Sequence, residues 1–243
     1  MSDLTEVRIA AVGDIHLGED VRGQYRKSLD GIDERADILM VAGDLTRHGT
    51  LAEGRVVADE LRDLPIPVVA VLGNHDYHSD LQHEIAGELR DAGVIVLNDE
   101  GVVIECPGTR LGVVGGKGFG GGFAGKCASE FGERETKNFV RHTRLIAESW
   151  QKALKEMDAD RKVVLSHYSP IKETLEGEPL EIYPFLGSYL LAEAVDTAGA
   201  DLILHGHAHK GSEKGMTSGG IRVRNVALPV LGAAYAVYRL SGD

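Results

Sequence analysis

Short polar clusters that end apolar runs carry the residues best suited to chemistry in this chain. They contain aspartate, histidine and asparagine, where plain turns would use serine, glycine or proline. The clusters are Asp14-Ile15-His16, Gly43-Asp44, Gly73-Asn74-His75-Asp76, Ser166-His167 and Gly206-His207-Ala208-His209. Carboxylate oxygens, imidazole nitrogens and an amide oxygen are ligands for divalent metals, so the clusters together predict a metal site.

The spacing within the clusters indicates how the ligands are shared. Asp14 and His16 stand two residues apart, and so do His207 and His209, so each pair points to one side of an extended chain end. The carboxylate of Asp44 has two oxygens and is the natural ligand for two cations to share. Mixed imidazole and carboxylate ligation suits Mn, Fe or Zn better than Ca. We therefore expect two divalent metal ions, whose identity among these three the sequence leaves open.

Each cluster follows an apolar run that is typical of a β-strand. The runs cover residues 7–12, 38–42, 68–72, 162–165 and 202–205. Strand-like runs alternate with helical patterns through the first third of the chain, which indicates βαβ units and parallel pairing. In an open α/β sheet, ligands bind beyond the carboxyl ends of the strands, so we expect the clusters to converge on one crevice.

The remaining patterns predict the elements that surround these strands. Helices are expected at residues 53–64, 134–157 and 185–198. Another helix is expected between Ser79, which forms a capping-box spacing with Gln82, and Gly93, which ends it. Short runs at 94–97, 102–105 and 110–114 are typical of an antiparallel meander, and 221–228 and 232–240 of strands. Together they predict an α/β (α+β) fold with two β-sheets face to face and helices outside, as a single domain over residues 1–243.

Composition and charge exclude several classes of partner. The formal net charge is −12 and there is no basic run, so nucleic acid is not an expected partner. Cys106 and Cys127 are too few for a disulfide framework, and neither a signal peptide nor a transmembrane run is evident. We expect a cytoplasmic protein without a membrane partner, in which bound cations attract an anionic substrate. The oligomeric state stays open, with a homodimer as one option.

The ordered series Asp-x-His, Gly-Asp, Gly-Asn-His-Asp, His and Gly-His-x-His resembles the calcineurin-like metallophosphoesterases, from Asp14 to His209. The resemblance implies a four-layer αββα sandwich of two mixed sheets, with a dinuclear metal centre at one edge. It implies that the first metal is held by Asp14, His16, Asp44 and His209. It implies that the second metal is held by Asp44, Asn74, His167 and His207. It also implies that His75 protonates the leaving group.

The expected chemistry is phosphoester hydrolysis. Two cations can lower the pKa of a bridging water and clamp both ends of an in-line displacement at phosphorus. The resulting hydroxide attacks phosphorus, and His75 acts as the general acid because a histidine titrates near neutrality. We expect the substrate to be a phosphodiester or a small phosphorylated metabolite.

One segment departs from the pattern of the protein phosphatases. These usually read Gly-Asp-x-Val-Asp-Arg-Gly, whereas residues 43–49 lack the second aspartate and have Arg47 displaced by one position. The Gly-Asp-Leu-Thr opening resembles the phosphodiesterase branch instead. Arg47, His48, Lys117 and Tyr168 are candidates to touch the substrate. A solvated turn, a flexible connector or ordinary packing would explain the same residues without such a role.

Other functions remain to be distinguished. A noncatalytic adaptor on the same fold would be expected to lose ligands or the acid histidine, and none is missing here. The short stretch after His209 leaves no room for the capping domain of the repair nucleases, so a nuclease is not expected. The glycine-rich residues 115–125 run into a near match to a P-loop, but Cys127 replaces its Ser or Thr. We expect a mobile loop there, near the metal site.

Overall fold

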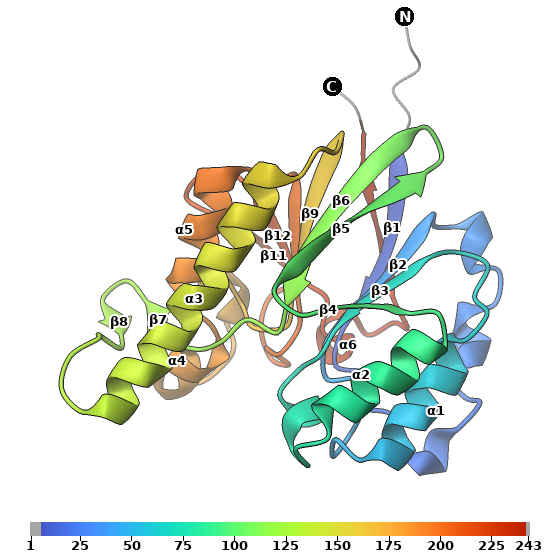
Figure 1. Ribbon diagram of the computed structural model, residues 1–243, viewed down its shortest axis with the longest axis horizontal. Helices are drawn as coiled ribbons and strands as arrows, with labels where there is room; N and C mark the ends of the chain where they lie inside the picture. Colours follow the sequence, from blue (N-terminus) through green and yellow to red (C-terminus); the bar gives the residue numbers. More distant parts are fainter. Residues whose placement is uncertain (1–5, 242–243) are drawn as a thin grey trace, which may run out of the picture.

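Both faces of the central strands are apolar, so each sheet must be covered on two sides. In β1 (Val7–Val12), Ile9 and Ala11 belong to one core cluster, whereas Ala10 and Val12 belong to another. The computed structural model describes residues 6–241. It shows four layers, with two mixed β-sheets face to face and helices on the outer face of each (Figure 1). The predicted αββα sandwich is therefore confirmed.

The first sheet has the strand order β13-β1-β2-β3-β4. Its other strands are β2 (Ile38–Ala42), β3 (Val68–Val71), β4 (Ile95–Leu97) and β13 (Ala236–Leu240). Strands β1 to β4 are parallel and β13 is antiparallel to β1. Helices α1 (Leu51–Leu61) and α2 (Gln82–Asp91) pack on its outer face through a shared apolar cluster.

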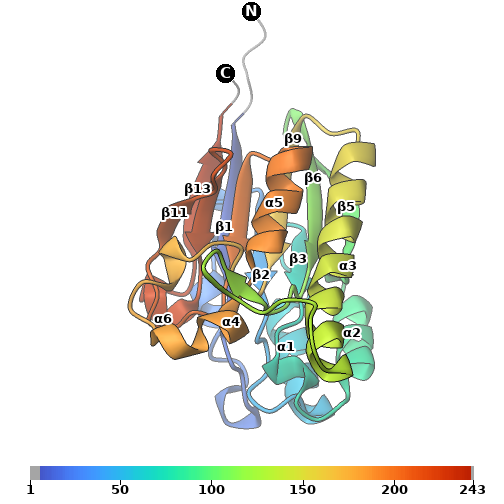
Figure 2. The same ribbon diagram turned by 90° about the vertical axis from the view of Figure 1, so that its left-hand side faces the viewer.

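The second sheet has the order β11-β12-β10-β9-β6-β5. Its strands are β5 (Glu100–Cys106), β6 (Thr109–Gly116), β9 (Arg161–Ser166), β10 (Leu202–His205), β11 (Lys214–Met216) and β12 (Arg222–Asn225). Helices α3 (Arg134–Glu156) and α5 (Tyr189–Ala198) cover its outer face (Figure 2). Trp150 of α3 is fully buried there, and its Nε1 donates to Asp99 Oδ1 at 3.0 Å.

Short elements complete the part of the chain that the structure describes. They are α4 (Tyr183–Leu186), α6 (Leu228–Leu231), the hairpin β7 (Gly122–Phe123) and β8 (Lys126–Cys127), and six 3₁₀ turns at Glu19–Val21, Arg26–Leu29, Ile32–Glu34, His75–Tyr77, Glu173–Leu175 and Leu180–Ile182. The glycine-rich segment after β6 is tied to α3, because Thr143 Oγ1 donates to the carbonyl of Gly120 at 2.5 Å. Within residues 6–241, no helix is long and apolar enough to cross a membrane.

Some predicted local structures are wrong for identifiable reasons. Residues 95–97 pair with β3 in parallel as β4 and do not join a meander. Ser79 does not cap α2, because the helix starts at Gln82 with Leu81 at its N-cap; the Ser79 hydroxyl donates to the carbonyl of His48 at 2.7 Å. The expected helix at 185–198 is broken at Gly187, where a Cβ would lie 1.9 Å from the carbonyl oxygen of Ser169.

The helix expected at 53–64 starts two residues earlier than predicted. Thr50 Oγ1 accepts from the backbone N–H of Glu53, and the Glu53 carboxylate accepts from that of Thr50. This capping box satisfies two of the free N–H groups at the helix start. It also fixes where the Gly43–Gly49 loop ends, which matters because that loop carries a metal-ligand candidate.

Candidate metal centre

Four of the ligand candidates have a backbone conformation that non-glycine residues rarely adopt. The φ angles of Asp14, His16, Asp44 and His207 are 57°, 42°, 51° and 71°. The left-handed region costs an L-residue roughly 1–2 kcal/mol, so strain gathers where the strands end. The prediction that Asp14 and His16 share one side of an extended chain end is therefore wrong in conformation. The turns nevertheless bring both side chains into one cluster.

Glycines next to the ligands allow the loops to approach one another. A Cβ at Gly73 would lie 2.1 Å from Asp44 Oδ1, and one at Gly206 would lie 2.3 Å from Asp14 Oδ2. Gly43 has φ 81°, and a Cβ there would lie 2.6 Å from His167 Nδ1. The loops after β2, β3 and β10 can therefore meet only because these positions lack a side chain.

The first ligand set consists of Asp14, His16, Asp44 and His209. One donor atom from each lies within 4.8 Å of the others. His209 Nε2 is 2.8 Å from Asp14 Oδ1, and His16 Nε2 is 3.7 Å from Asp44 Oδ2. Both carboxylates are buried at 2% and 1% exposure, which concentrates negative charge at the base of the set.

The second set shares Asp44 with the first. Asp44, His167 and His207 also offer donor atoms within 4.8 Å of one another. Asn74 Oδ1 lies 2.9 Å from His167 Nε2, which is itself 3.3 Å from Asp44 Oδ1. All seven predicted ligands are therefore brought together, in two groups that meet at one carboxylate.

Hydrogen bonds to the backbone orient two of the imidazoles. His167 Nδ1 donates to the carbonyl of Ala42 at 2.9 Å, which leaves its Nε2 lone pair toward Asn74 and Asp44. His207 Nε2 lies 3.2 Å from the carbonyl of Phe185, which leaves the lone pair of Nδ1 free to bind a metal. Metal-binding histidines typically donate their other ring N–H in this way.

The charge state of the cluster fits divalent cations. Burial is the main cause that raises the pKa of Asp14 to about 6, against the opposing hydrogen bond from His209. Burial lowers the pKa of His207 to about 3 and that of His167 well below its ordinary value, so both rings are neutral at pH 7. Neutral imidazoles beside crowded carboxylates are what a metal requires of its ligands.

His75 lies beside the two sets and is held by one ring nitrogen. Its Nδ1 donates to the carbonyl of Arg47 at 2.8 Å, and its Nε2 lies 3.9 Å from Asp44 Oδ2. Its backbone N–H donates to Asp44 Oδ1 at 2.8 Å. The side chain is 44% exposed, so its free nitrogen can reach a substrate.

Asp76 ties together two of the loops that carry ligands. Its fully buried carboxylate accepts from the backbone N–H groups of Leu45, Thr46 and Gly73 at 3.2, 2.8 and 2.8 Å, and from Thr46 Oγ1 at 2.6 Å. Sequence reasoning missed Thr46. Thr46 belongs to the Gly43-Asp44-Leu45-Thr46 motif, but that motif does not indicate a contact with Asp76.

The four candidates for substrate contact lie in different surroundings. Arg47 Nη1 pairs with Asp20 Oδ1 at 3.0 Å, and His48 Nδ1 lies 2.9 Å from Glu53 Oε1, so carboxylates outside the cluster hold both side chains. The Tyr168 ring lies 4.3 Å from the His207 ring.

Lys117 is the fourth candidate. Its half-buried ammonium lies over the Tyr168 ring at 5.0 Å from the centroid, and burial lowers its pKa to about 8. Lys117 and Tyr168 therefore adjoin the metal-ligand cluster. The substrate role of all four residues stays a prediction.

The chain belongs to the calcineurin-like phosphoesterase family, whose family model matches residues 7–211. The fold is similar to that of phosphopantetheinyl hydrolase from Mycobacterium tuberculosis (TM-score 0.64, 17% identity, covering 90% of this chain and 88% of that one). It is also similar to the anchor protein of the Plasmodium inner membrane complex (TM-score 0.59, 12% identity, 98% and 82% coverage). Comparison with curated proteins gives no match.

Proposed function

We propose that this protein hydrolyses phosphoesters with two divalent cations, held by two ligand sets that share Asp44. The observation that carries the proposal is this sharing. Two groups of donor atoms, each within 4.8 Å, have the same buried carboxylate in common. Membership of the calcineurin-like phosphoesterase family supports the same conclusion.

Cations bound there would lower the pKa of a coordinated water and offset the charge that develops on a phosphoryl group. The protein's own part is to place the ligands and a proton donor. His75 fits the second task, because the Arg47 carbonyl orients the ring and leaves Nε2 facing Asp44 and the open side of the cluster. A general acid in this position gives a proton to the departing oxygen and contributes about 10²–10⁴ in rate.

We propose a phosphodiester or a small phosphorylated metabolite as the substrate class. A backbone carbonyl orients His75, where the phosphatase pattern would use an aspartate at the position of Arg47. This departure favours the phosphodiesterase branch over the protein phosphatases. A noncatalytic adaptor is the alternative, because the Plasmodium protein of similar fold is an anchor, but the complete ligand set argues against it.

The test is hydrolysis of bis-p-nitrophenyl phosphate and p-nitrophenyl phosphate by metal-free protein reloaded with Mn²⁺. We expect turnover that depends on added metal and that Asp44→Asn reduces at least a thousandfold, with loss of bound metal. Asp59→Asn is the matched control, because this carboxylate is exposed and pairs with Arg22 on the surface. No turnover of either ester by protein with quantified metal would contradict the proposal, and a stable partner complex unaffected by Asp44→Asn would favour the adaptor.

A further inference from the structure

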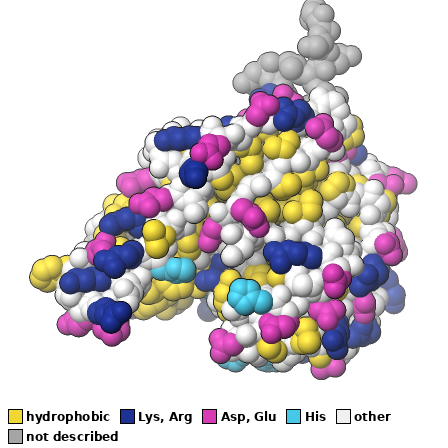
Figure 3. Space-filling model, viewed as in Figure 1, with side chains coloured by type: hydrophobic (Ala, Val, Ile, Leu, Met, Phe, Trp, Pro, Cys, Tyr) yellow, Lys and Arg dark blue, Asp and Glu magenta, His cyan; other side chains and the backbone are white. Residues whose placement is uncertain are grey.

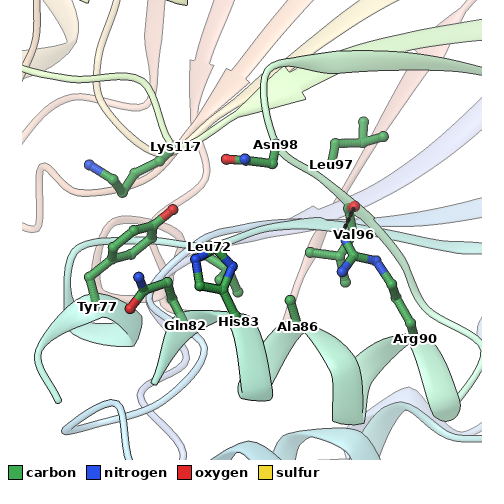
Figure 4. Close-up of a pocket in the computed structure, with 10 residues that line it drawn as sticks. All are labelled: Leu72, Tyr77, Gln82, His83, Ala86, Arg90, Val96, Leu97, Asn98 and Lys117. Carbon is green, nitrogen blue, oxygen red and sulfur yellow. Dashed lines mark hydrogen bonds between the residues drawn. The ribbon is translucent and has the colours of Figure 1, made fainter. Parts of the chain in front are cut away.

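A small pocket lies next to the metal-ligand cluster and has no part in the chemistry described so far. Its volume is about 50 Å³, more than the roughly 10–15 Å³ that a single water needs. Lys117 and Asn98 extend from one side, and Tyr77, Gln82 and His83 extend from the other (Figure 4). The pocket therefore lies between the start of α2 and the carboxyl ends of β4 and β6.

The pocket wall contains two cations and several hydrogen-bonding groups, which include Gln82 Oε1, an acceptor left unpaired within residues 6–241. Lys117 and Arg90 contribute positive charge, and His83, Asn98 and Tyr77 contribute further polar groups. None of the described residues that line it carries a carboxylate, although the chain has a net charge of −12. Figure 3 shows acidic and basic side chains interspersed over the visible surface, so a wall with cations and no carboxylate differs from its surroundings. Such a wall suits an anion that accepts several hydrogen bonds.

The ammonium of Lys117 is left without a polar partner. Among the described residues, no carboxylate lies within 4.0 Å of it and no hydrogen bond satisfies it. It rests instead on the rings of Tyr77, Phe119 and Tyr168, at 5.1, 4.7 and 5.0 Å from their centroids. The carboxylates of Asp99 and Asp44 attract the ammonium only from farther away, and Asp99 Oδ1 accepts from Trp150 Nε1. Aromatic faces hold a cation in place but do not neutralise its charge.

The pocket is joined directly to the loops of the metal centre. The carbonyl of Lys117 accepts from the backbone N–H of His167 at 3.2 Å, and the centre of the Tyr168 ring lies 5.0 Å from the Lys117 ammonium and 4.3 Å from that of the His207 ring. Tyr77 follows His75 within the same 3₁₀ turn. The loops that carry the metal-ligand candidates therefore also border the pocket.

We propose that this pocket is an oxyanion subsite, which holds a second phosphate group of the substrate beside the scissile one. The assignment rests on the proposed function, because it places the scissile phosphate at the metal centre. Its chemistry is independent of the metals, since the positive charge comes from Lys117. The same chemistry would accept free inorganic phosphate, so the experiment must separate the two sources.

Equilibrium dialysis with radiolabelled inorganic phosphate on the full-length, metal-loaded protein gives the first test. We expect the wild type to bind two phosphates per chain. Lys117→Met is expected to weaken the pocket phosphate at least tenfold and leave one, whereas Lys117→Arg keeps both. Lys152→Met removes an equal charge from the exposed face of α3 and is expected to change nothing. Circular dichroism melting confirms that each variant is folded.

The outcomes separate the subsite from the proposed function. If the wild type binds one phosphate and Lys117→Met does not weaken its binding, the subsite is overturned. If the wild type binds one phosphate and Lys117→Met abolishes its binding, the subsite is supported. That result would count against phosphate binding at the metal centre. Asp44→Asn gives an independent check, since it is expected to lose the metal-centre phosphate and keep the one at Lys117.

Hydrolysis of matched bisphosphates and monophosphates of the same sugar or nucleoside identifies the source of the anion. We expect kcat/KM to be at least tenfold higher for the bisphosphate of a pair in the wild type. In Lys117→Met the ratio is expected to approach one. If no pair in such a panel shows a preference, the assignment of the pocket to the substrate is overturned.

Discussion

His75 and Asp76 are neighbours in sequence and have separate tasks. His75 has one ring nitrogen bound to the carbonyl of Arg47 and the other free, 3.9 Å from Asp44 Oδ2. Asp76 is fully buried and accepts from backbone N–H groups of two loops. One side chain is therefore available to the substrate, and the other holds the loops that position it.

We predict that His75→Ala lowers kcat by about 10²–10⁴ with bound metal unchanged, because a general acid is lost and a ligand is not. The loss is expected to be larger for phenyl phosphate than for p-nitrophenyl phosphate, since nitrophenolate leaves without a proton. Steady-state kinetics and metal analysis by mass spectrometry measure both effects. His78→Ala, at an exposed histidine in the next turn, serves as the control. Loss of metal in His75→Ala would show that His75 is a ligand instead.

We predict that Asp76→Ala lowers the free energy of unfolding by about 3 kcal/mol, because buried N–H groups lose an ionised acceptor. The Gly43–Gly49 loop would then separate from Gly73, and metal affinity would fall as well. Urea denaturation of metal-free protein measures the first effect. Asp91→Ala, at the exposed end of α2, is expected to stay within about 0.5 kcal/mol of the wild type. An equal change in the two variants would contradict the bridging role.

The turns that follow the strands can meet only where their backbones approach closely. Gly73 follows β3 and lies against Asp44, so its missing side chain sets the distance between the loops after β2 and β3. Gly87 is a contrasting position in α2, where a Cβ would meet nothing within 4 Å. The two glycines therefore separate the effect of contact from the effect of backbone freedom.

We predict that Gly73→Ala abolishes most metal binding, because a Cβ 2.1 Å from Asp44 Oδ1 must displace the shared carboxylate. Gly87→Ala is expected to stabilise the protein by about 0.5–1 kcal/mol, since alanine is the better helix former. Metal titration by calorimetry and thermal melting measure the two results. Normal metal affinity in Gly73→Ala would contradict the argument that contact with this glycine places Asp44.

The same elements show what sequence can and cannot predict. The strands before Asp14, Asp44 and His167 were predictable, because buried parallel strands are continuous apolar runs that end in polar residues. The left-handed turns at Asp14 and Asp44 were not, since φ above zero at an aspartate is imposed by contacts with distant loops. Ser79 and Thr50 both stand three residues before a Gln or Glu. Only Thr50 caps a helix, because α2 starts at Gln82 with Leu81 at its N-cap, which leaves Ser79 outside the helix.

The Lys117 pocket is the part of the site that the sequence predicts least well. Lys117 was singled out beside a glycine-rich segment, but its aromatic neighbours come from separate elements: Tyr77 from the turn after β3 and Tyr168 from the loop after β9. Their convergence depends on how the two sheets are placed face to face. Residue spacing within one segment carries no information about that placement.

At the scale of the whole molecule, the sandwich gathers carboxylates from distant parts of the chain into its interior. Asp14, Asp44 and Asp76 are 2%, 1% and 0% exposed, and the charge of Asp44 raises the pKa of both others after burial itself. Bringing like charges together inside a fold is unfavourable unless a cation joins them. The stability of this protein should therefore depend on metal, and in a way that changes with pH.

We predict that metal stabilises the fold strongly at pH 7 and weakly near pH 5. Burial raises the pKa of Asp14 from 3.8 to about 6, so the folded, metal-free protein holds a proton at Asp14 between these values that the unfolded chain has lost. The contribution of Asp14 to the stability of the metal-free protein therefore falls as pH rises through this window, whereas the lowered pKa values of His167, His205 and His207 act in the opposite direction. Metal needs the ionised carboxylate, so metal-loaded protein gains as pH rises. At a hundredfold excess over Kd the gain is about 2.7 kcal/mol, or roughly 5–10 °C in Tm.

Thermal melting at pH 5, 6 and 7, with EDTA and with Mn²⁺, measures the stabilisation by metal as the difference in Tm between the two conditions, which should grow from pH 5 to pH 7. Asp14→Asn cannot ionise, so the stability of the metal-free variant should rise more steeply with pH than that of the wild type, and most of the stabilisation by metal should be lost. Asp158→Asn, an exposed carboxylate that pairs with Arg110, should leave both slopes as they are. Parallel slopes with and without metal in the wild type would mean that the buried carboxylates do not carry the metal-linked stability.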